Sequence, residues 1–313
     1  MTSALNYGGR WPILQSELAH SCAERQVGPT LSKLPSDLRD QVTRALREDV
    51  GSGDVTANLI SAAQIARAQV LCREPAVLCG AAWFDETFRQ IDAAVQVSWH
   101  YPEGASVAAD SVLCALAGPT RALLTGERTA LNFLQLLSGT ATLTRRYVDA
   151  ISGTSCQILD TRKTIPGLRT AQKYAVHCGG ASNHRMGLYD LVLIKENHIA
   201  AAGSIGAAVS GARALAPQLR IEVEVENLQQ LREALQARTD IILLDNFNLE
   251  QLRAAVAINR ADERPVLLES SGGVTLQGVG AVAETGVDFI SVGALTKHVS
   301  AIDLSMRIVT PGG

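Results

Sequence analysis

The sequence contains no uninterrupted apolar run near the ~18–20 residues that a membrane-spanning helix needs. Its first twenty residues lack the basic region and apolar core of a secretory signal. The six cysteines include no C-x-x-C pair and no accompanying zinc-ligand pattern. These absences predict buried thiols in a reducing compartment, and they favour a cytoplasmic protein with no membrane partner.

Several common catalytic motifs are also absent. There is no Walker A loop, no Rossmann glycine pattern, no H-E-x-x-H and no G-x-S-x-G. Hydride transfer and covalent hydrolase chemistry therefore lack support. The formal net charge of -3 gives no general attraction to nucleic acid, so a basic site has to be local.

The composition is that of an ordinary globular protein, with 47% hydrophobic and 19% charged residues. A length of 313 residues is enough for one or two domains. Helical spacing of apolar residues predicts a helix over residues 35–48. A long helix follows over residues 123–151, with Ser138-Gly139 as a possible interruption. Between them the pattern predicts antiparallel strands over residues 68–77, 95–101 and 111–117.

The second half of the chain has a different pattern. Short apolar runs alternate with segments whose apolar residues have helical spacing, such as residues 227–237 and 249–257. This order predicts parallel strands with crossover helices. Six runs, with room for one more, favour a barrel over the alternative, an open doubly wound sheet. The runs are residues 157–159, 191–194, 221–225, 241–244, 266–268 and 289–292.

Polar or glycine-rich residues follow nearly every apolar run. In a βα barrel the loops after the carboxyl ends of the strands form the active site, so these residues predict one shared site. In chain order they are Thr161, Arg162 and Lys163, then Lys195, then Glu224 within its run, Asp245, then Ser271, Gly272 and Gly273, and finally Gly293 and Ala294.

The segment from Thr161 to His198 concentrates positive charge, with six lysines and arginines against two acids. Arginine and lysine suit the binding of carboxylates and phosphates. His184 and Arg185 follow a glycine-containing loop that could close over an anion. Arg169 and Lys173, four residues apart, fit a solvated helix face.

The acids and glycines suggest further roles. Glu222, Glu224 and Glu226 alternate along one run and so share one side of a strand, where a solvated face is expected for one of them. Glu224 and Asp245 could converge on magnesium or on sugar hydroxyls. The glycines after the last two runs fit a phosphate site, and a simple tight turn is the alternative.

Six blocks of sequence resemble quinolinate phosphoribosyltransferases, over about residues 34–307 and outside residues 1–30. The resemblance implies an N-terminal α+β open-faced sandwich joined to an incomplete, roughly seven-stranded α/β barrel. The blocks are EDVGSGDVT (48–56), ERTALNFL (127–134), TRKTIPGLR (161–169), GASNHRMGL (180–188), IKENH (194–198) and GVDFISVGALTK (286–297).

The same resemblance implies a division into an extension over residues 1–30, a sandwich over residues 31–130, completed by about residues 299–313, and a barrel over residues 131–298. It implies a homodimer, with a hexamer as a further possibility, in which Arg128 reaches the partner's site.

The resemblance also implies transfer of phosphoribosyl from phosphoribosyl pyrophosphate to quinolinate, with decarboxylation, in NAD biosynthesis. Glu224 and Asp245 would hold Mg²⁺ and the ribose, and Ser271–Gly273 and Val292–Ala294 the 5′-phosphate. Gly273 departs from the asparagine of many relatives. The cations that would bind quinolinate and phosphates are Arg128, Arg162, Lys163, His184, Arg185 and Lys195.

Two alternatives remain open. One is a related barrel phosphoribosyltransferase that uses a different base without decarboxylation, or the paralogue found beside molybdate-transport genes. The other is a non-catalytic, anion-binding barrel, which the presence of both the basic and the acidic site residues disfavours.

Overall fold

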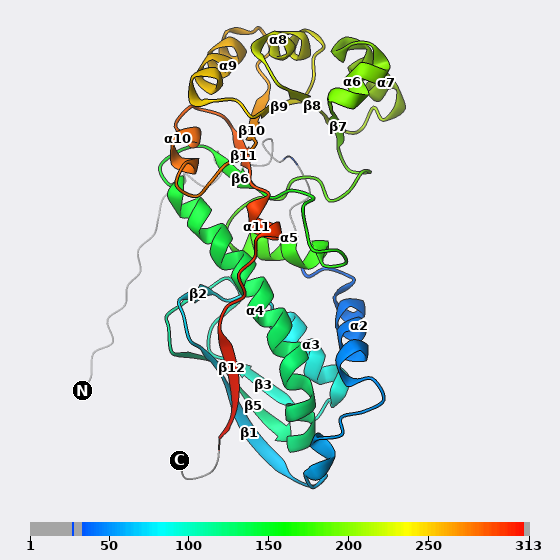
Figure 1. Cartoon of the computed structure of the whole chain (residues 1–313), viewed down its shortest axis with the longest axis vertical. Helices are drawn as coiled ribbons and strands as arrows, with labels where there is room; N and C mark the ends of the chain where they lie inside the picture. The colour runs from blue at the N-terminus through cyan, green and yellow to red at the C-terminus, as the bar shows by residue number, and fades with distance from the viewer. Residues whose placement is uncertain (1–26, 28–32, 310–313) are drawn as a thin grey trace, which may run out of the picture.

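A computed structural model describes residue 27 and residues 33–309 of the chain. Two units lie at either end of one long helix, α4 (Figure 1). The predicted extension over residues 1–30 falls outside the described residues apart from Val27, which is buried. In the described part of the chain, no helix is both long and apolar enough to cross a bilayer.

The N-terminal unit is an antiparallel four-stranded sheet with helices on one face. In β1, buried Ala68, Val70 and Cys72 alternate with exposed Arg67 and Gln69, because successive side chains of a strand point to opposite faces. The strand order is β12-β1-β5-β3, so among the described residues the last strand pairs with the first (Figure 1). These strands are β1 (Ile65–Cys72), β3 (Gln96–Trp99), β5 (Ser111–Pro119) and β12 (Leu304–Val309).

The helices of this unit cover the buried face of the sheet. Phe84 and Phe88 of α3 and Leu131 of α4 pack with Val70 and Leu116 of the sheet in one apolar cluster. The elements are α2 (Leu38–Val50), α3 (Ala81–Ile91) and α4 (Thr120–Ala150), with the 3-10 turn η1 (Ala57–Leu59) and the small pair β2 (Ala76–Val77) and β4 (Ser106–Val107).

Helix α4 is continuous, so the predicted interruption at Ser138-Gly139 is wrong. These residues are small because other segments approach them closely. A Cβ on Gly139 would lie 2.1 Å from the carbonyl oxygen of Ser300, and the Ser138 hydroxyl bonds both the N–H and the C=O of Cys79. Close packing, rather than a helix break, accounts for this sequence.

The C-terminal unit is a parallel sheet of six strands in the order β6-β11-β10-β9-β8-β7. All six predicted runs form strands. The first four positions of β9 are buried because helices cover the outer side of the sheet and side chains fill its inner side. The strands are β6 (Gln157–Leu159), β7 (Val192–Ile194), β8 (Ile221–Val225), β9 (Ile241–Asp245), β10 (Leu267–Ser271) and β11 (Phe289–Ser291).

Crossover helices connect these strands. The side chain of Asn227 accepts from two backbone N–H groups of the next turn and that of Asn248 from one, so a helix starts shortly after β8 and after β9. The connecting helices are α5 (Arg169–Cys178), α6 (Glu196–Ala202), α7 (Ile205–Leu215), α8 (Leu228–Gln236), α9 (Leu249–Ala261) and α10 (Val279–Ala283), while α11 (Ala294–Lys297) follows the last barrel strand and leads back to β12.

The sheet is curved but not closed. A seventh repeat is reduced to one parallel bridge between Ser182 and Leu159 of β6. Two residues later, His184 contacts side chains of both β8 and β10, so the segment lies across the concave side of the sheet. The expected incomplete barrel is thus present with six strands, and the alternative of a flat doubly wound sheet does not fit.

Candidate active site

The loops after the strands meet at one end of the barrel. The Thr296 hydroxyl donates to the carbonyl of Lys163 at 2.8 Å, which ties α11 to the loop after β6. A Cβ on Gly293 would lie 2.9 Å from Cδ of Lys163. On the other side, the N–H of Asn246 donates to the carbonyl of Ser271 at 2.9 Å. Residues far apart in the sequence therefore share one surface.

A cavity of about 170 Å³ opens at this end of the barrel. It brings together cations from three different loops with the carboxylates of Glu224 and Glu269. Such a site can hold an anion with several negative groups. The predicted residues that line it are Thr161, Arg162, Lys163, His184, Arg185, Lys195, Glu224 and Ser271.

The other predicted residues lie outside this lining. Asp245 ends β9, and the glycines follow β10 and β11. Arg128 is exposed on α4 and lines a separate cavity of about 300 Å³ with Asp49, Asp54 and Thr125. Within one described chain, Arg128 is therefore not part of the strand-end cavity.

A buried ion pair supports the floor of the site. Lys173 of α5 contacts Asp160, which follows β6, and both side chains are fully buried. Lys173 also donates to the carbonyl of His184 at 2.8 Å, while Asp160 accepts from the His184 N–H at 2.9 Å and from Asn183 at 2.7 Å. The pair thus fixes the segment that carries His184 and Arg185.

The solvated helix face predicted for Arg169 and Lys173 is therefore wrong. Arg169 donates to the carbonyl of Met186 at 3.1 Å and to the Thr164 hydroxyl at 3.1 Å. It joins the loop after β6 to the segment after His184. Spacing of four residues along a helix could not show that both cations point toward the protein interior.

His184 lies between two buried carboxylates. Its Nε2 is 3.0 Å from Glu222 and 3.4 Å from Glu269, and both acids are fully buried. Burial lowers the pKa of His184, but Glu269 and Glu222 together raise it by more. Burial, with the charge of Glu269 added, raises the pKa of Glu222 to about 7.

The second ring nitrogen of His184 is also engaged, because Nδ1 accepts the N–H of Arg185 at 2.7 Å. In the neutral ring an acceptor nitrogen carries no proton, so this bond requires the neutral form to keep its proton on Nε2, beside the two carboxylates. To donate to a substrate through Nδ1, His184 must first lose its bond from Arg185. The contribution of this residue in the present arrangement is to position Arg185.

Two of the three alternating acids lie on β8 and the third, Glu226, directly follows it, and their burial falls toward the open end of the strand. Glu222 is fully buried, Glu224 is half-buried and contacts Lys195, and Glu226 is exposed. Asp245 ends the neighbouring strand and accepts from the Asn246 amide at 2.7 Å.

Glu224 and Asp245 form a donor set that fits magnesium. Carboxylate oxygens are the ligands that Mg²⁺ prefers, and it usually keeps several waters and binds through one or two carboxylates. Glu224 forms an ion pair with Lys195, so the ammonium group of Lys195 would repel a metal cation bound to Glu224.

The loop after β10 leaves no room for a side chain at Gly272. Gly272 has φ +102°, and a Cβ there would lie 2.1 Å from Oδ1 of Asn246. Gly273 has φ +59° and open space around it, a conformation that asparagine also tolerates. An asparagine at this position would thus fit the backbone.

We expect Gly272→Ala to disturb the loop and to weaken the binding of a phosphate group there by at least ~10-fold, since both the φ value and the contact oppose a Cβ. The measurement is binding of ribose 5-phosphate by calorimetry. Gly203→Ala, at φ +87° with open space, is the matched control. Equal affinity in the two variants would contradict a close backbone approach at Gly272.

Comparison with known proteins identifies the family. The models for the quinolinate phosphoribosyl transferase N-terminal and C-terminal domains match residues 54–138 and 140–307. The chain belongs to the quinolinate phosphoribosyltransferase family. Within this family, the chain is 44% identical over 278 residues to the nicotinate-nucleotide pyrophosphorylase [carboxylating] of Mycobacterium leprae, covering 86% of this chain and 96% of that one.

Two further relatives extend this likeness. The probable nicotinate-nucleotide pyrophosphorylase [carboxylating] of Bacillus subtilis is 43% identical, with 83% of this chain and 90% of that one covered. The solved nicotinate-nucleotide pyrophosphorylase of Francisella tularensis is 46% identical, with a TM-score of 0.85 over 90% of this chain and all of that chain. The likeness to these family members spans both units of the fold.

Sequence reasoning missed the buried residues behind the site. Glu269 was not singled out, and Asp160 and Lys173 were given no role in support. One signal was available, since Glu269 lies two residues before Ser271 and so points to the same side of its strand. The contact of Glu269 with His184 depends on the curvature of the sheet, which no local pattern contains.

Proposed function

We propose that this protein transfers the phosphoribosyl group of phosphoribosyl pyrophosphate to quinolinate, with release of pyrophosphate and carbon dioxide, to form nicotinate mononucleotide. The observation that carries the proposal is the strand-end cavity, where Arg162, Lys163, Arg185 and Lys195 lie with Glu224. The relatives that share the family's two domains bear names with this activity. Together these support a catalytic barrel rather than a non-catalytic one.

The cations have the first task, which is to bring two anions together. Quinolinate has two carboxylates and phosphoribosyl pyrophosphate carries several phosphate charges, so they repel each other in water. Arg162, Lys163 and Arg185 offset this repulsion at fixed positions. Substrates held in contact at these positions then react with little further loss of entropy.

Bond cleavage at the ribose C1 leaves positive charge on the sugar and adds negative charge to the departing pyrophosphate. In this proposal Lys163 and Lys195 stabilise the growing negative charge and Glu224 holds the ribose hydroxyls, and the fact that all three line one cavity supports these roles. When Mg²⁺ is bound at Glu224 and Asp245, it supplies further neutralisation of pyrophosphate. No protein nucleophile is required, because the pyridine nitrogen attacks C1 with its own electron pair.

Decarboxylation follows from the charge of the ring. Once C1 is bonded to nitrogen, the pyridinium ring accepts the electron pair that remains when the adjacent carboxylate leaves as carbon dioxide. A proton then replaces that carboxylate on the ring carbon. The protein's contribution here is to orient the carboxylate and to limit its contact with water.

The experiment that tests this function is release of labelled carbon dioxide from quinolinate labelled in the carboxyl group next to nitrogen. We expect release that depends on both phosphoribosyl pyrophosphate and Mg²⁺, and that stops when a chelator removes the metal. Nucleotide formation from nicotinate, with no labelled release from quinolinate, would instead support the alternative barrel phosphoribosyltransferase.

We further propose a homodimer in which Arg128 enters the partner's site. The exposed position of Arg128 on α4, in a cavity separate from the cluster of cations, supports this assignment. Measurement of the molar mass in solution distinguishes a dimer from a hexamer.

We also propose a cytoplasmic location, which agrees with the five free cysteines among the described residues.

Mixing two inactive variants tests the shared site. Arg128→Ala and Lys195→Ala each remove one part of every site, but a hybrid dimer contains one site with both parts intact. We expect the mixture to regain up to about one quarter of native activity after subunit exchange, the statistical share of intact sites in freely mixed dimers. Exchange is verified by mass spectrometry of the intact dimer.

Two control mixtures complete this test. Arg162→Ala with Lys195→Ala places both defects in the same cavity, so no hybrid site is intact and no activity should return. Recovery in that mixture, or none with Arg128→Ala after verified exchange, would contradict the assignment of Arg128 to the partner's site.

A further inference from the structure

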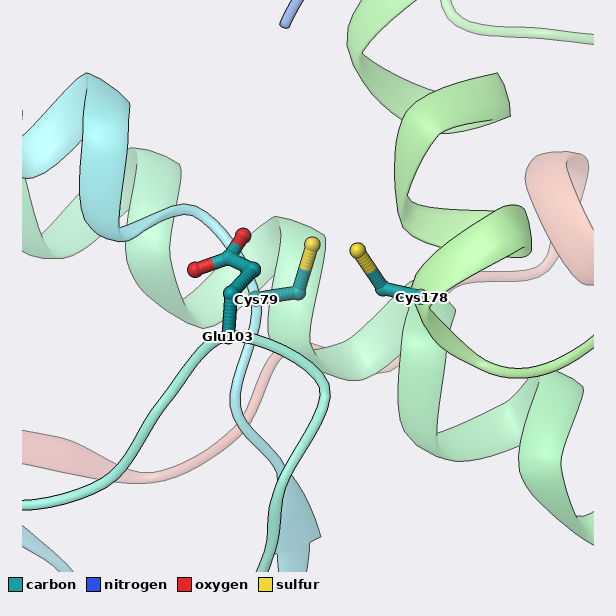
Figure 2. A group of neighbouring side chains, drawn as sticks. All are labelled: Cys79, Glu103 and Cys178. Atoms are coloured by element: carbon teal, nitrogen blue, oxygen red, sulfur yellow. The ribbon is translucent and has the colours of Figure 1, made fainter. Parts of the chain in front are cut away.

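A second cluster of reactive side chains lies where the two units meet, outside the strand-end cavity. In Figure 2 the sulfur atoms of Cys79 and Cys178 point toward each other, and the carboxylate of Glu103 lies beside Cys79. One donor atom from each residue lies within 4.8 Å of the other two. Cys79 and Glu103 belong to the N-terminal unit, whereas Cys178 ends α5 of the barrel. The cluster therefore connects the two units.

The backbone on both sides of the cluster is held by α4. The Ser138 hydroxyl accepts from the N–H of Cys79 and donates to its C=O, each at 3.0 Å. Next to Cys178, Gly179 presses on α4 so closely that a Cβ would lie 2.5 Å from Cβ of Thr144. The two sulfur atoms therefore approach each other from fixed backbones, which is the preorganisation that a metal site requires.

Glu103 is held by the start of α3. Its two carboxylate oxygens accept from the N–H groups of Gly80 at 2.7 Å and Ala81 at 3.2 Å. Each carboxylate oxygen has two lone pairs, so one remains on each for a further ligand. Hydrogen bonds of this kind orient carboxylate ligands in metal sites.

The donor types of the cluster suit a cation. Cys79 is buried and Glu103 and Cys178 are partly buried, so three groups that become negative on losing a proton lie together. Burial raises the pKa of Cys79 and of Glu103, so both favour their neutral forms while no cation is bound. A bound divalent cation would stabilise the negative form of all three.

We propose that Cys79, Glu103 and Cys178 form a binding site for a thiophilic divalent cation such as Zn²⁺. Two thiolates and one carboxylate are donors that zinc accepts in tetrahedral sites, whereas Mg²⁺ prefers oxygen alone. Cys178 is only half-buried, so a water molecule can complete the coordination from that side. Binding releases the thiol protons to solvent and involves no oxidation.

The site has no sequence signature because its two cysteines come from different units. Zinc sites that can be read from a sequence have two ligands within a few residues of each other. Here the ligand atoms meet only after α5 packs against α4. The proposal is independent of the transferase activity, since none of its three residues lines the strand-end cavity.

The test is a titration of the full-length protein with Co²⁺, a spectroscopic substitute for Zn²⁺, after reduction with a phosphine and removal of metal. We expect a thiolate-to-cobalt charge-transfer band that saturates at one equivalent, is displaced by Zn²⁺, and strengthens as pH rises because thiol protons leave. Cys178→Ser should weaken affinity at least about 100-fold, as loss of even an outer-shell partner costs 10–100-fold.

Controls separate this site from others. Cys114→Ser alters a buried cysteine of β5 outside the cluster and should leave the band unchanged. Cobalt bound to Glu224 and Asp245 would give no sulfur band. Circular dichroism checks that each variant is folded, and the half-buried Cys178 serves as the test position if Cys79→Ser does not fold. Absence of the band, or its persistence in folded Cys178→Ser, would overturn the proposal.

Discussion

Replacing Lys163 by alanine lowers the turnover number with quinolinate by at least ~10²-fold, the scale expected when one preorganised transition-state donor is lost. The reason is the position of Lys163, which lines the strand-end cavity and packs against Gly293 at the start of α11. Its ammonium group can therefore follow the charge that grows on pyrophosphate. Initial rates over a range of both substrate concentrations separate this effect from a change in KM.

Arg162→Ala should give a loss of the same order, because its guanidinium lies in the same cavity. Lys33→Ala is the matched control, since it removes an equal charge from an exposed position outside that cavity. Its rate should equal that of the native protein. Near-native turnover in Lys163→Ala or Arg162→Ala would exclude that residue from the catalytic machinery, while the labelled-release assay on the native protein tests the reaction itself.

Replacing Asp160 by alanine lowers the free energy of unfolding by ~3–5 kcal/mol, the usual cost of removing one partner of a buried ion pair. The substitution leaves Lys173 as an uncompensated buried charge, and it also deprives Asn183 and His184 of an acceptor. The measurement is equilibrium unfolding in urea. Turnover should fall with it, since the segment that carries Arg185 loses its anchor.

Two comparisons give this prediction its physical content. Asp160→Leu combined with Lys173→Met removes both charges, so the double variant should be more stable than Asp160→Ala. Arg89→Ala removes a solvent-exposed arginine from its pair with Glu86 and should change stability less, because solvent screens the charge of that arginine. If Asp160→Ala were no more destabilising than Arg89→Ala, the buried pair would not be a support of the site.

Much of the fold followed from local patterns. All six apolar runs of the second half form strands, because a buried parallel strand must be apolar on both faces. The positions of Arg162, Lys195 and Asp245 were also predictable, since the loops after parallel strands lie at one end of a barrel. These inferences required only spacing along the chain and the resemblance to known enzymes.

Other predictions failed where the answer depended on a distant segment. Ser138-Gly139 has the composition of a helix break, yet α4 continues because Ser300 and Cys79 pack against that point. Lys173 has the spacing of a solvated residue, yet Asp160 pairs with it in the interior. In both cases the partner lies far away in the sequence, so the local pattern alone cannot show that the contact forms.

The sequence by itself determined the order of strands and helices and the chemical types of the residues at the strand ends, because periodicity and turn residues act over a few positions. The tertiary structure decided which side chains meet. It set His184 between Glu222 and Glu269, and it brought Cys79 to Cys178. These contacts arise from sheet curvature and helix packing. Both depend on interactions between distant parts of the chain, so no short segment of the sequence encodes them.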